Sequence, residues 1–283
     1  MKVRKPYVAN AFYAGTKTNL TQQIRDCFTH NFGPGQVPDV RENGPRKVLG
    51  IVSPHAGYMY SGPVAANGFA KLAEDGIPEV FIILGPNHTG QGSGVSILTD
   101  GAWETPIGTS KIQTELAERI QKSNGILDID EASHAYEHSI EVQLPFIQFL
   151  YGDSMKFIPI CMMMQDLRTS REIAKSIVDQ CQGKDYVIIA SSDFTHYEPQ
   201  DVANKKDKAA IDAILNLDDE ALNNLGESNR VTMCGYGPIT TLIAAAKLMT
   251  GIKPELLTHK TSGDITGDKS AVVGYSSLVF TRQ

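Results

Sequence analysis

Apolar residues along the chain fall into two patterns. Short runs rich in β-branched residues alternate with longer segments in which apolar residues recur every three or four positions. The first pattern is typical of buried strands and the second of amphipathic helices, so their alternation indicates an α/β fold. The predicted strands cover Lys47–Ser53, Val80–Leu84, Gly94–Leu98, Lys156–Ile160, Tyr186–Ala190, Glu255–His259 and Ala271–Phe280. The predicted helices cover Pro63–Glu74, Lys111–Ser123, Ile140–Tyr151, Arg168–Gln182, Val202–Asn216, Asp218–Leu225 and Pro238–Met249.

The predicted strands indicate how the sheet is built. Val80–Leu84 is apolar throughout, as expected of a parallel strand that helices cover on both faces. The last two predicted strands are joined by a polar segment, 262–269, and we expect them to form an antiparallel addition. Residues 34–46 are rich in glycine, proline and charge, which predicts a surface loop. We therefore predict a single domain, 1–283, with a mixed, mostly parallel sheet flanked by helices.

Composition and charge narrow the function classes. Of the 283 residues, 41% are hydrophobic and 20% are charged, as in an ordinary globular protein. The formal net charge of −6 argues against a nucleic-acid partner, because phosphate binding needs a basic face. We expect no signal peptide and no membrane segment, because the apolar runs are too short for either. The four cysteines lie far apart, which favours reduced thiols and a cytoplasmic location.

Three histidines follow predicted strands. His55 lies in SPHAGY (53–58), His88 in GPNH (85–88) and His196 in SSDFTH (191–196). The carboxyl ends of strands in an open α/β sheet line the ligand crevice, so loops at this edge can bring the three side chains together. One such histidine alone would be ordinary at a surface or a helix cap. Three in one chain favour a metal site or an acid–base site.

Cys234 is a fourth candidate. It precedes the predicted helix that Pro238 opens, where the helix dipole and free backbone amides favour a thiolate. A thiolate is both a metal ligand and a nucleophile. The alternative is a buried structural thiol beside a glycine turn.

His134 and His138 form a further pair. On a helix, residues four apart share one face, as do the two histidines of HExxH zinc sites. Ala135 occupies the place of the glutamate in that motif, which excludes such a site. We expect one or both histidines to face the pocket as substrate contacts or proton donors. Ser139 or a neighbour is predicted to cap the helix that follows.

At these segments the sequence resembles the Memo family, named for a mediator of ErbB-driven cell motility in animals. The prokaryotic branch is often called AmmeMemoRadiSam system protein B. The resemblance extends from ANAFY (9–13) to GYSS (274–277). Its most specific segments are SPHAGY (53–58), GPNH (85–88), EHSIEVQLP (137–145) and SSDFTH (191–196).

This resemblance implies the α/β fold of the class III extradiol dioxygenases, which bind non-haem iron. The implied ligands of Fe(II), with copper or zinc as alternatives, are His55, His88 and Cys234. His196 would lie beside the metal as ligand or acid–base group, with Asp193 supporting it, and His138 would help to move protons. Iron(II) oxygenases commonly use two histidines and a carboxylate. A thiolate in the third position therefore leaves ring cleavage itself open.

The leading hypothesis is an iron-binding, dioxygenase-like redox protein. Because its ligands must be deprotonated, its metal affinity should fall below about pH 6. The alternative is a binding module without catalysis, whose pocket, with Tyr58, Tyr60 and Trp103, would hold a peptide or a phosphotyrosine ring. A zinc hydrolase is a third hypothesis. Prokaryotic members of the family are thought to act with an AMMECR-type protein and a radical SAM enzyme, which makes these candidate partners.

Overall fold

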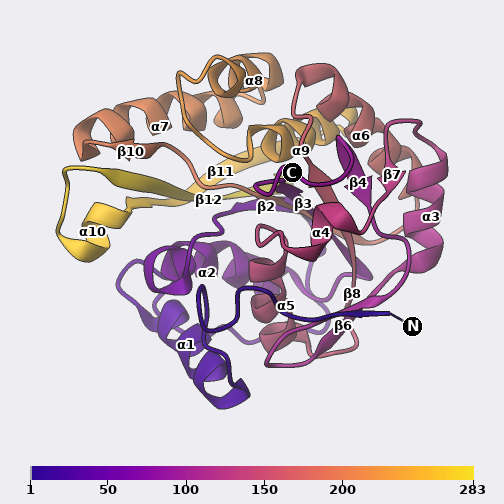
Figure 1. Ribbon diagram of the computed structural model, residues 1–283, viewed down its shortest axis with the longest axis horizontal. Coiled ribbons are helices and arrows are strands. Elements are labelled where there is room, and N and C mark those ends of the chain that lie inside the picture. Colours follow the sequence, from indigo (N-terminus) through magenta and orange to yellow (C-terminus); the bar gives the residue numbers. More distant parts are fainter. Residues whose placement is uncertain (1) are drawn as a thin grey trace.

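The computed structural model describes residues 2–283 and arranges their strands in a mixed β-sheet (Figure 1). The strands are β1 (Val3–Arg4), β2 (Val48–Ser53), β3 (Val80–Pro86), β4 (Val95–Ile97), β5 (Ala102–Glu104), β6 (Thr109–Ile112), β7 (Asp128–Ile129), β8 (Lys156–Met162), β9 (Tyr186–Ser191), β10 (His196–Glu198), β11 (Ile252–Thr261) and β12 (Val272–Arg282). The helices are α1 (Lys17–Thr29), α2 (Tyr58–Asp75), α3 (Thr114–Lys122), α4 (Ala132–Ala135), the 3₁₀ turn η1 (Glu141–Gln143), α5 (Leu144–Tyr151), α6 (Leu167–Gln180), α7 (Gln200–Leu215), α8 (Asp219–Glu227), α9 (Tyr236–Leu248) and α10 (Ser262–Thr266).

The centre of the sheet is parallel. Strands follow the order β1-β5-β6-β8-β3-β9-β2-β12-β10, and neighbours from β6 to β2 run parallel. β12 pairs antiparallel with β2, β10 and β11. The predicted mixed, mostly parallel sheet and its antiparallel C-terminal addition are confirmed.

Helices cover both faces of the sheet (Figure 1). α1, α2 and α5 pack together on one face, and α6, α8 and α9 on the other. Every residue of β2, β3 and β9 is buried between these two layers. This explains why the central strands are apolar throughout rather than alternating. Among the described residues, no helix has the length and apolar character needed to cross a membrane.

Tertiary contacts moved several predicted boundaries. α2 begins at Tyr58, five residues before Pro63, and Tyr58 itself is buried. α3 begins at Thr114 because Lys111 and Ile112 pair with β8 as part of β6. The polar segment after β11 holds α10, which a capping box between Thr261 and Asp264 starts. These corrections concern where elements begin, while the central strands lie where the apolar runs placed them.

Candidate metal centre

His55 is the most enclosed histidine at the carboxyl edge of the sheet. It follows β2, is 2% exposed, and its backbone N–H donates to Asp193 Oδ1 over 2.8 Å. Its ring Nδ1 lies 2.8 Å from Ser191 Oγ, whose own proton is given to the Ser139 carbonyl. Ser191 therefore accepts from His55 Nδ1–H. This leaves the Nε2 lone pair of His55 directed toward Cys234 Sγ, 3.1 Å away, where it can accept from the thiol or bind a metal ion.

His88 is oriented by a buried carboxylate. It follows β3, and its ring Nδ1 lies 2.9 Å from Glu137 Oε1 while its backbone N–H donates to Glu137 Oε2 over 2.5 Å. The same carboxylate accepts from the backbone N–H groups of His138 and Ser139, each over 2.8 Å. Because a carboxylate only accepts, the proton of His88 sits on Nδ1 and its Nε2 lone pair is free. A carboxylate behind a histidine is the usual second layer of a metal site.

His138 completes a cluster of three imidazoles. Its ring stacks on His88, with centroids 4.6 Å apart, and meets His55 edge-on at 5.5 Å. One ring nitrogen from each of His55, His88 and His138 lies within 4.8 Å of those of the other two. Three donors this close, from loops that follow different elements, can converge on one metal ion.

Cys234 lies at the edge of this cluster. Its Sγ is 3.1 Å from His55 Nε2 and accepts from the backbone N–H of Asp193 over 3.3 Å. Metal–nitrogen and metal–sulfur bonds are about 2.0 and 2.3 Å long, so donor atoms this far apart can share one ion. Gly235 permits this approach, because a Cβ there would lie 2.3 Å from the Ser191 carbonyl oxygen.

His196 and Asp193 lie beside the cluster with separate hydrogen-bond partners. His196 opens β10, and its ring Nδ1–H donates to the Thr232 carbonyl over 2.8 Å, which leaves Nε2 as a proton acceptor. The Asp193 carboxylate accepts from the backbone of His55, so its hydrogen bond positions the His55 loop. Six of the candidate side chains therefore gather at one edge of the sheet: His55, His88, His138, Asp193, His196 and Cys234.

Comparison with known proteins identifies the family of this chain. The family model described as Memo-like protein matches residues 4–279. The chain belongs to the Memo-like family. A MEMO1 family protein of Methanopyrus kandleri is 50% identical over 281 residues, covering 99% of each chain. Another from Methanothermobacter thermautotrophicus is 46% identical over 278 residues, covering 98% of this chain and 99% of the relative.

One solved structure shares the fold of this Memo-like protein at low sequence identity. It is the crystal structure of an uncharacterized protein from Escherichia coli K12, with a TM-score of 0.51 and 13% identity. The match covers 82% of this chain and all of the other. At this identity the likeness supports the architecture alone.

Burial keeps two histidines of the Memo-like site, His55 and His138, neutral. It holds the pKa of His55 well below the usual range, and the neighbouring histidines lower it further. Burial also lowers the pKa of His138 to about 4, although Glu137 opposes the shift. Burial alone would raise the pKa of Glu137, but the hydrogen bond and charge of His88 lower it to about 2. Neutral imidazoles, as at His55 and His138, are the protonation state that metal binding requires.

The pKa values of Cys234 and Asp193 are raised rather than lowered, because burial favours the neutral form of an acid. Burial raises the pKa of the Cys234 thiol, and the nearby Asp193 charge raises it further. The expectation that the start of α9 favours a thiolate is therefore wrong for the metal-free protein, since burial outweighs the helix dipole. A bound cation would reverse this, because its charge favours deprotonation of a coordinating thiol. Burial likewise raises the pKa of Asp193 to about 6.

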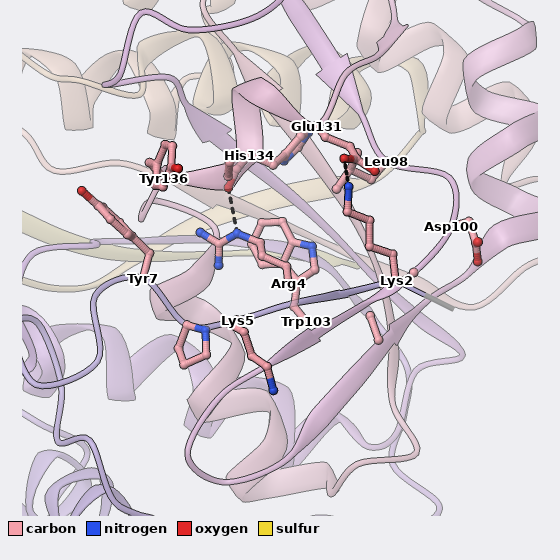
Figure 2. Close-up of a pocket in the computed structure, with 14 residues that line it drawn as sticks. Lys2, Arg4, Lys5, Tyr7, Leu98, Asp100, Trp103, Glu131, His134 and Tyr136 are labelled. Atoms are coloured by element: carbon pink, nitrogen blue, oxygen red, sulfur yellow. Dashed lines mark hydrogen bonds and ion pairs between the residues drawn. The ribbon is translucent and has the colours of Figure 1, made fainter.

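The side chain of His134 points away from the cluster of His55, His88 and His138. Its Nε2 contacts Ser96 Oγ at 3.0 Å, and its ring meets Trp103 edge-on. α4 ends at Ala135, so the two histidines of the 134–138 pair do not share a helical face. His134 and Trp103 line a cavity of about 340 Å³. Figure 2 shows both residues beside Arg4. Only His138 of the pair joins the cluster with His55 and His88.

The prediction that Tyr58 and Trp103 help to form a pocket around the histidines is therefore wrong. Trp103 belongs to the cavity of Figure 2, and Tyr58 is buried, with its hydroxyl donating to the Val142 carbonyl over 2.6 Å. The predicted cap at Ser139 is also wrong, because its Oγ donates to the Pro86 carbonyl. That bond ties the loop before η1 to the end of β3.

Sequence reasoning missed the central role of Glu137. Glu137 lies in the EHSIEVQLP segment, and a carboxylate next to a histidine is a signal for a second layer of a metal site. Tyr197 was also missed. It is 78% exposed beside His196 and adopts a φ of 60°, a left-handed conformation that is uncommon for a residue other than glycine.

Proposed function

We propose that this Memo-like protein binds a non-haem iron(II) ion and uses it in redox chemistry on a small aromatic or reduced molecule. His55 and His88 would hold the ion, and Cys234 and His138 would supply the further donors. The observation that carries the proposal is the cluster of three histidine nitrogens within 4.8 Å of one another. Hydrogen bonds that fix the proton of His55 and of His88 on Nδ1, and so leave Nε2 of each ring as the donor atom for a metal, support it.

The donor set fits a redox-active metal. Imidazole suits iron, copper and zinc, and thiolate favours the softer members of that group. A bound iron(II) ion would supply one-electron chemistry and open coordination positions. The buried walls formed by β2, β3 and β9 exclude water from the inner side of the cluster.

The protein's own residues would orient the reactants and move protons. Glu137 fixes the tautomer of His88, and Ser191 fixes that of His55. His196, held by the Thr232 carbonyl, presents Nε2 as a base that can take the proton of a substrate hydroxyl. Tyr197 is the exposed aromatic side chain next to this base and can contact a planar ring.

Metal content tests the proposal. Protein purified without oxygen and without a histidine tag is analysed for iron, copper and zinc beside His55→Ala, His88→Ala, His138→Ala and Cys234→Ser. His30→Ala is the matched control, because His30 is an exposed histidine whose Nδ1 accepts only from the Phe32 backbone. Near-stoichiometric iron that the site variants lose and the control keeps would support the proposal.

Other outcomes would overturn it. Absence of metal, or metal retained in all site variants, would remove the metal centre. Zinc in place of iron, with ester or amide hydrolysis and no oxygen uptake, would point to a hydrolase. Equal binding of a phosphotyrosine peptide by metal-free and metal-loaded protein would favour the binding module. The AMMECR-type and radical SAM partners and the cytoplasmic location stay predictions.

A further inference from the structure

The N-terminal strand contacts the loop that carries Glu137 and His138. β1 pairs with β5 at the far edge of the sheet, and the guanidinium of Arg4 extends from it into the loop (Figure 2). Arg4 Nε donates to the His134 carbonyl and Nη2 to the Glu137 carbonyl, each over 2.8 Å. Nη1 donates to Glu141 Oε2 over 2.6 Å. All three acceptors lie between residues 134 and 141.

The surroundings of Arg4 make these contacts rigid. Its side chain is 11% exposed, Glu141 is completely buried, and the guanidinium stacks over Trp103 at 4.1 Å. Charged hydrogen bonds that are shielded from water are stronger than exposed ones. The planar guanidinium serves three acceptors in fixed directions, which the single ammonium group of lysine cannot reproduce.

Glu141, which lies in the 134–141 loop, also binds the N-terminal segment beyond Arg4. Its carboxylate accepts from the backbone N–H groups of Tyr7 and Val8 and from the Tyr13 hydroxyl. The N-terminal segment and the 134–141 loop are thus joined through one buried ion pair. A displacement of Arg4 would be transmitted to the Glu137 backbone rather than absorbed by solvent.

We infer that Arg4 is a positioning residue of the metal centre. By holding the Glu137 carbonyl it holds the carboxylate that orients His88 and borders His138. Arg4 donates to neither imidazole, so its effect passes through the 134–141 loop that carries Glu137. The inference rests on the proposed function for its metal readout, while the orientation of His88 is testable without metal.

Proton NMR of the metal-free protein tests the orientation. A ring N–H held by a buried carboxylate gives a slowly exchanging, downfield resonance, which we assign to His88 Nδ1–H by its loss in Glu137→Gln. Arg4→Lys should shift or lose this resonance. Lys5→Gln is the matched control, because it removes a neighbouring positive charge that pairs only with the partly exposed Glu104. An unchanged resonance in Arg4→Lys would overturn the inference.

Cobalt(II) binding supplies the second readout. Loss of an outer-layer contact lowers metal affinity by about 10- to 100-fold. We expect Arg4→Lys to bind cobalt(II) at least about tenfold more weakly than the parent, with an altered visible spectrum, and Lys5→Gln to match the parent. Equal affinity and spectra in Arg4→Lys would overturn the inference. A parent that binds no cobalt(II) or iron would instead count against the proposed function, and the NMR result would still decide the role of Arg4.

A second variant covers the case in which Arg4→Lys does not fold. The double change Arg4→Met with Glu141→Gln removes both charges together and leaves an amide oxygen for the groups that donate to Glu141. Replacing a buried ion pair by neutral groups is tolerated far better than removing one partner. The double variant should fold, as judged by far-UV circular dichroism, and should show the same altered resonance and weaker cobalt(II) binding. A folded double variant that matches the parent in both readouts would overturn the inference.

Discussion

Replacing Glu137 by glutamine should destabilise the metal-free protein by about 3 kcal/mol at neutral pH. The Glu137 carboxylate is completely buried and accepts four hydrogen bonds. Its pKa falls from the usual 4.5 to about 2. One pKa unit corresponds to about 1.4 kcal/mol, so a difference of about 2.5 units means that the ionised form of Glu137 stabilises the folded protein by about 3 kcal/mol. The neutral amide forfeits that contribution and turns a donor toward the His88 N–H.

The sign of the pH dependence follows from the same shift. Because the pKa of Glu137 is lowered in the folded state, its stabilisation is complete above about pH 4.5 and is lost as the pH falls toward about 2. The difference in unfolding free energy between parent and Glu137→Gln should therefore shrink by about 1.4 kcal/mol between pH 7 and pH 3.5.

Urea unfolding of the metal-free proteins measures both quantities. Far-UV circular dichroism and the emission of Trp103, the single tryptophan, report the transition, and their coincidence tests two-state behaviour. Glu131→Gln is the control, because Glu131 is 60% exposed and should change stability by less than about 0.5 kcal/mol. A loss below about 1 kcal/mol in Glu137→Gln, or a loss independent of pH, would refute the assigned role of the carboxylate.

Three further predictions concern other parts of the site and its surroundings. Burial lowers the pKa of His134 to about 3, so near pH 6 only the unfolded chain binds a proton at this residue. In urea titrations the parent should therefore lose about 2 kcal/mol more stability than His134→Gln between pH 7 and pH 5. An equal loss of stability in the two proteins would contradict this. Because the pKa of Cys234 is raised, its thiol should react slowly with iodoacetamide at pH 8. Mass spectrometry should show alkylation at least about tenfold slower in the folded metal-free protein than in urea. Equal rates would show an activated thiolate. Gly235→Ala should lower the free energy of unfolding by about 1–3 kcal/mol, because the added Cβ overpacks against the Ser191 carbonyl. Gly125→Ala, whose Cβ would meet nothing within 4 Å, should lower it much less in the same urea titrations. Equal losses in the two variants would contradict the overpacking.

The hydrophobic pattern was sufficient for the centre of the fold. β2, β3, β8 and β9 lie where continuous apolar runs predicted them, because a strand buried on both faces has no polar positions to disguise it. Elements at the periphery were missed. α1 is mostly polar and buries only one stripe, and β1, β5 and β6 are too short for a periodic pattern. Their conformation depends on the neighbour that they pack against.

The sequence by itself determined at which edge of the sheet the candidate site residues gather. His55 and His88 follow parallel neighbours of β9, and the carboxyl ends of parallel strands meet at one edge whatever the loops contain. The Memo-like motifs pointed to the same residues. The order of the motifs along the chain is therefore enough to place these candidate residues at one edge of the sheet.

Only the tertiary structure decided how the side chains are used. His134 and His138 are equivalent by spacing, yet a break in the helix after α4 sends one against Trp103 and the other into the cluster. Likewise, Glu137 and Arg4 are 133 residues apart and become partners only when β1 joins the sheet. Periodicity describes one element at a time, whereas the orientation of a ring depends on hydrogen bonds from elements distant in the sequence.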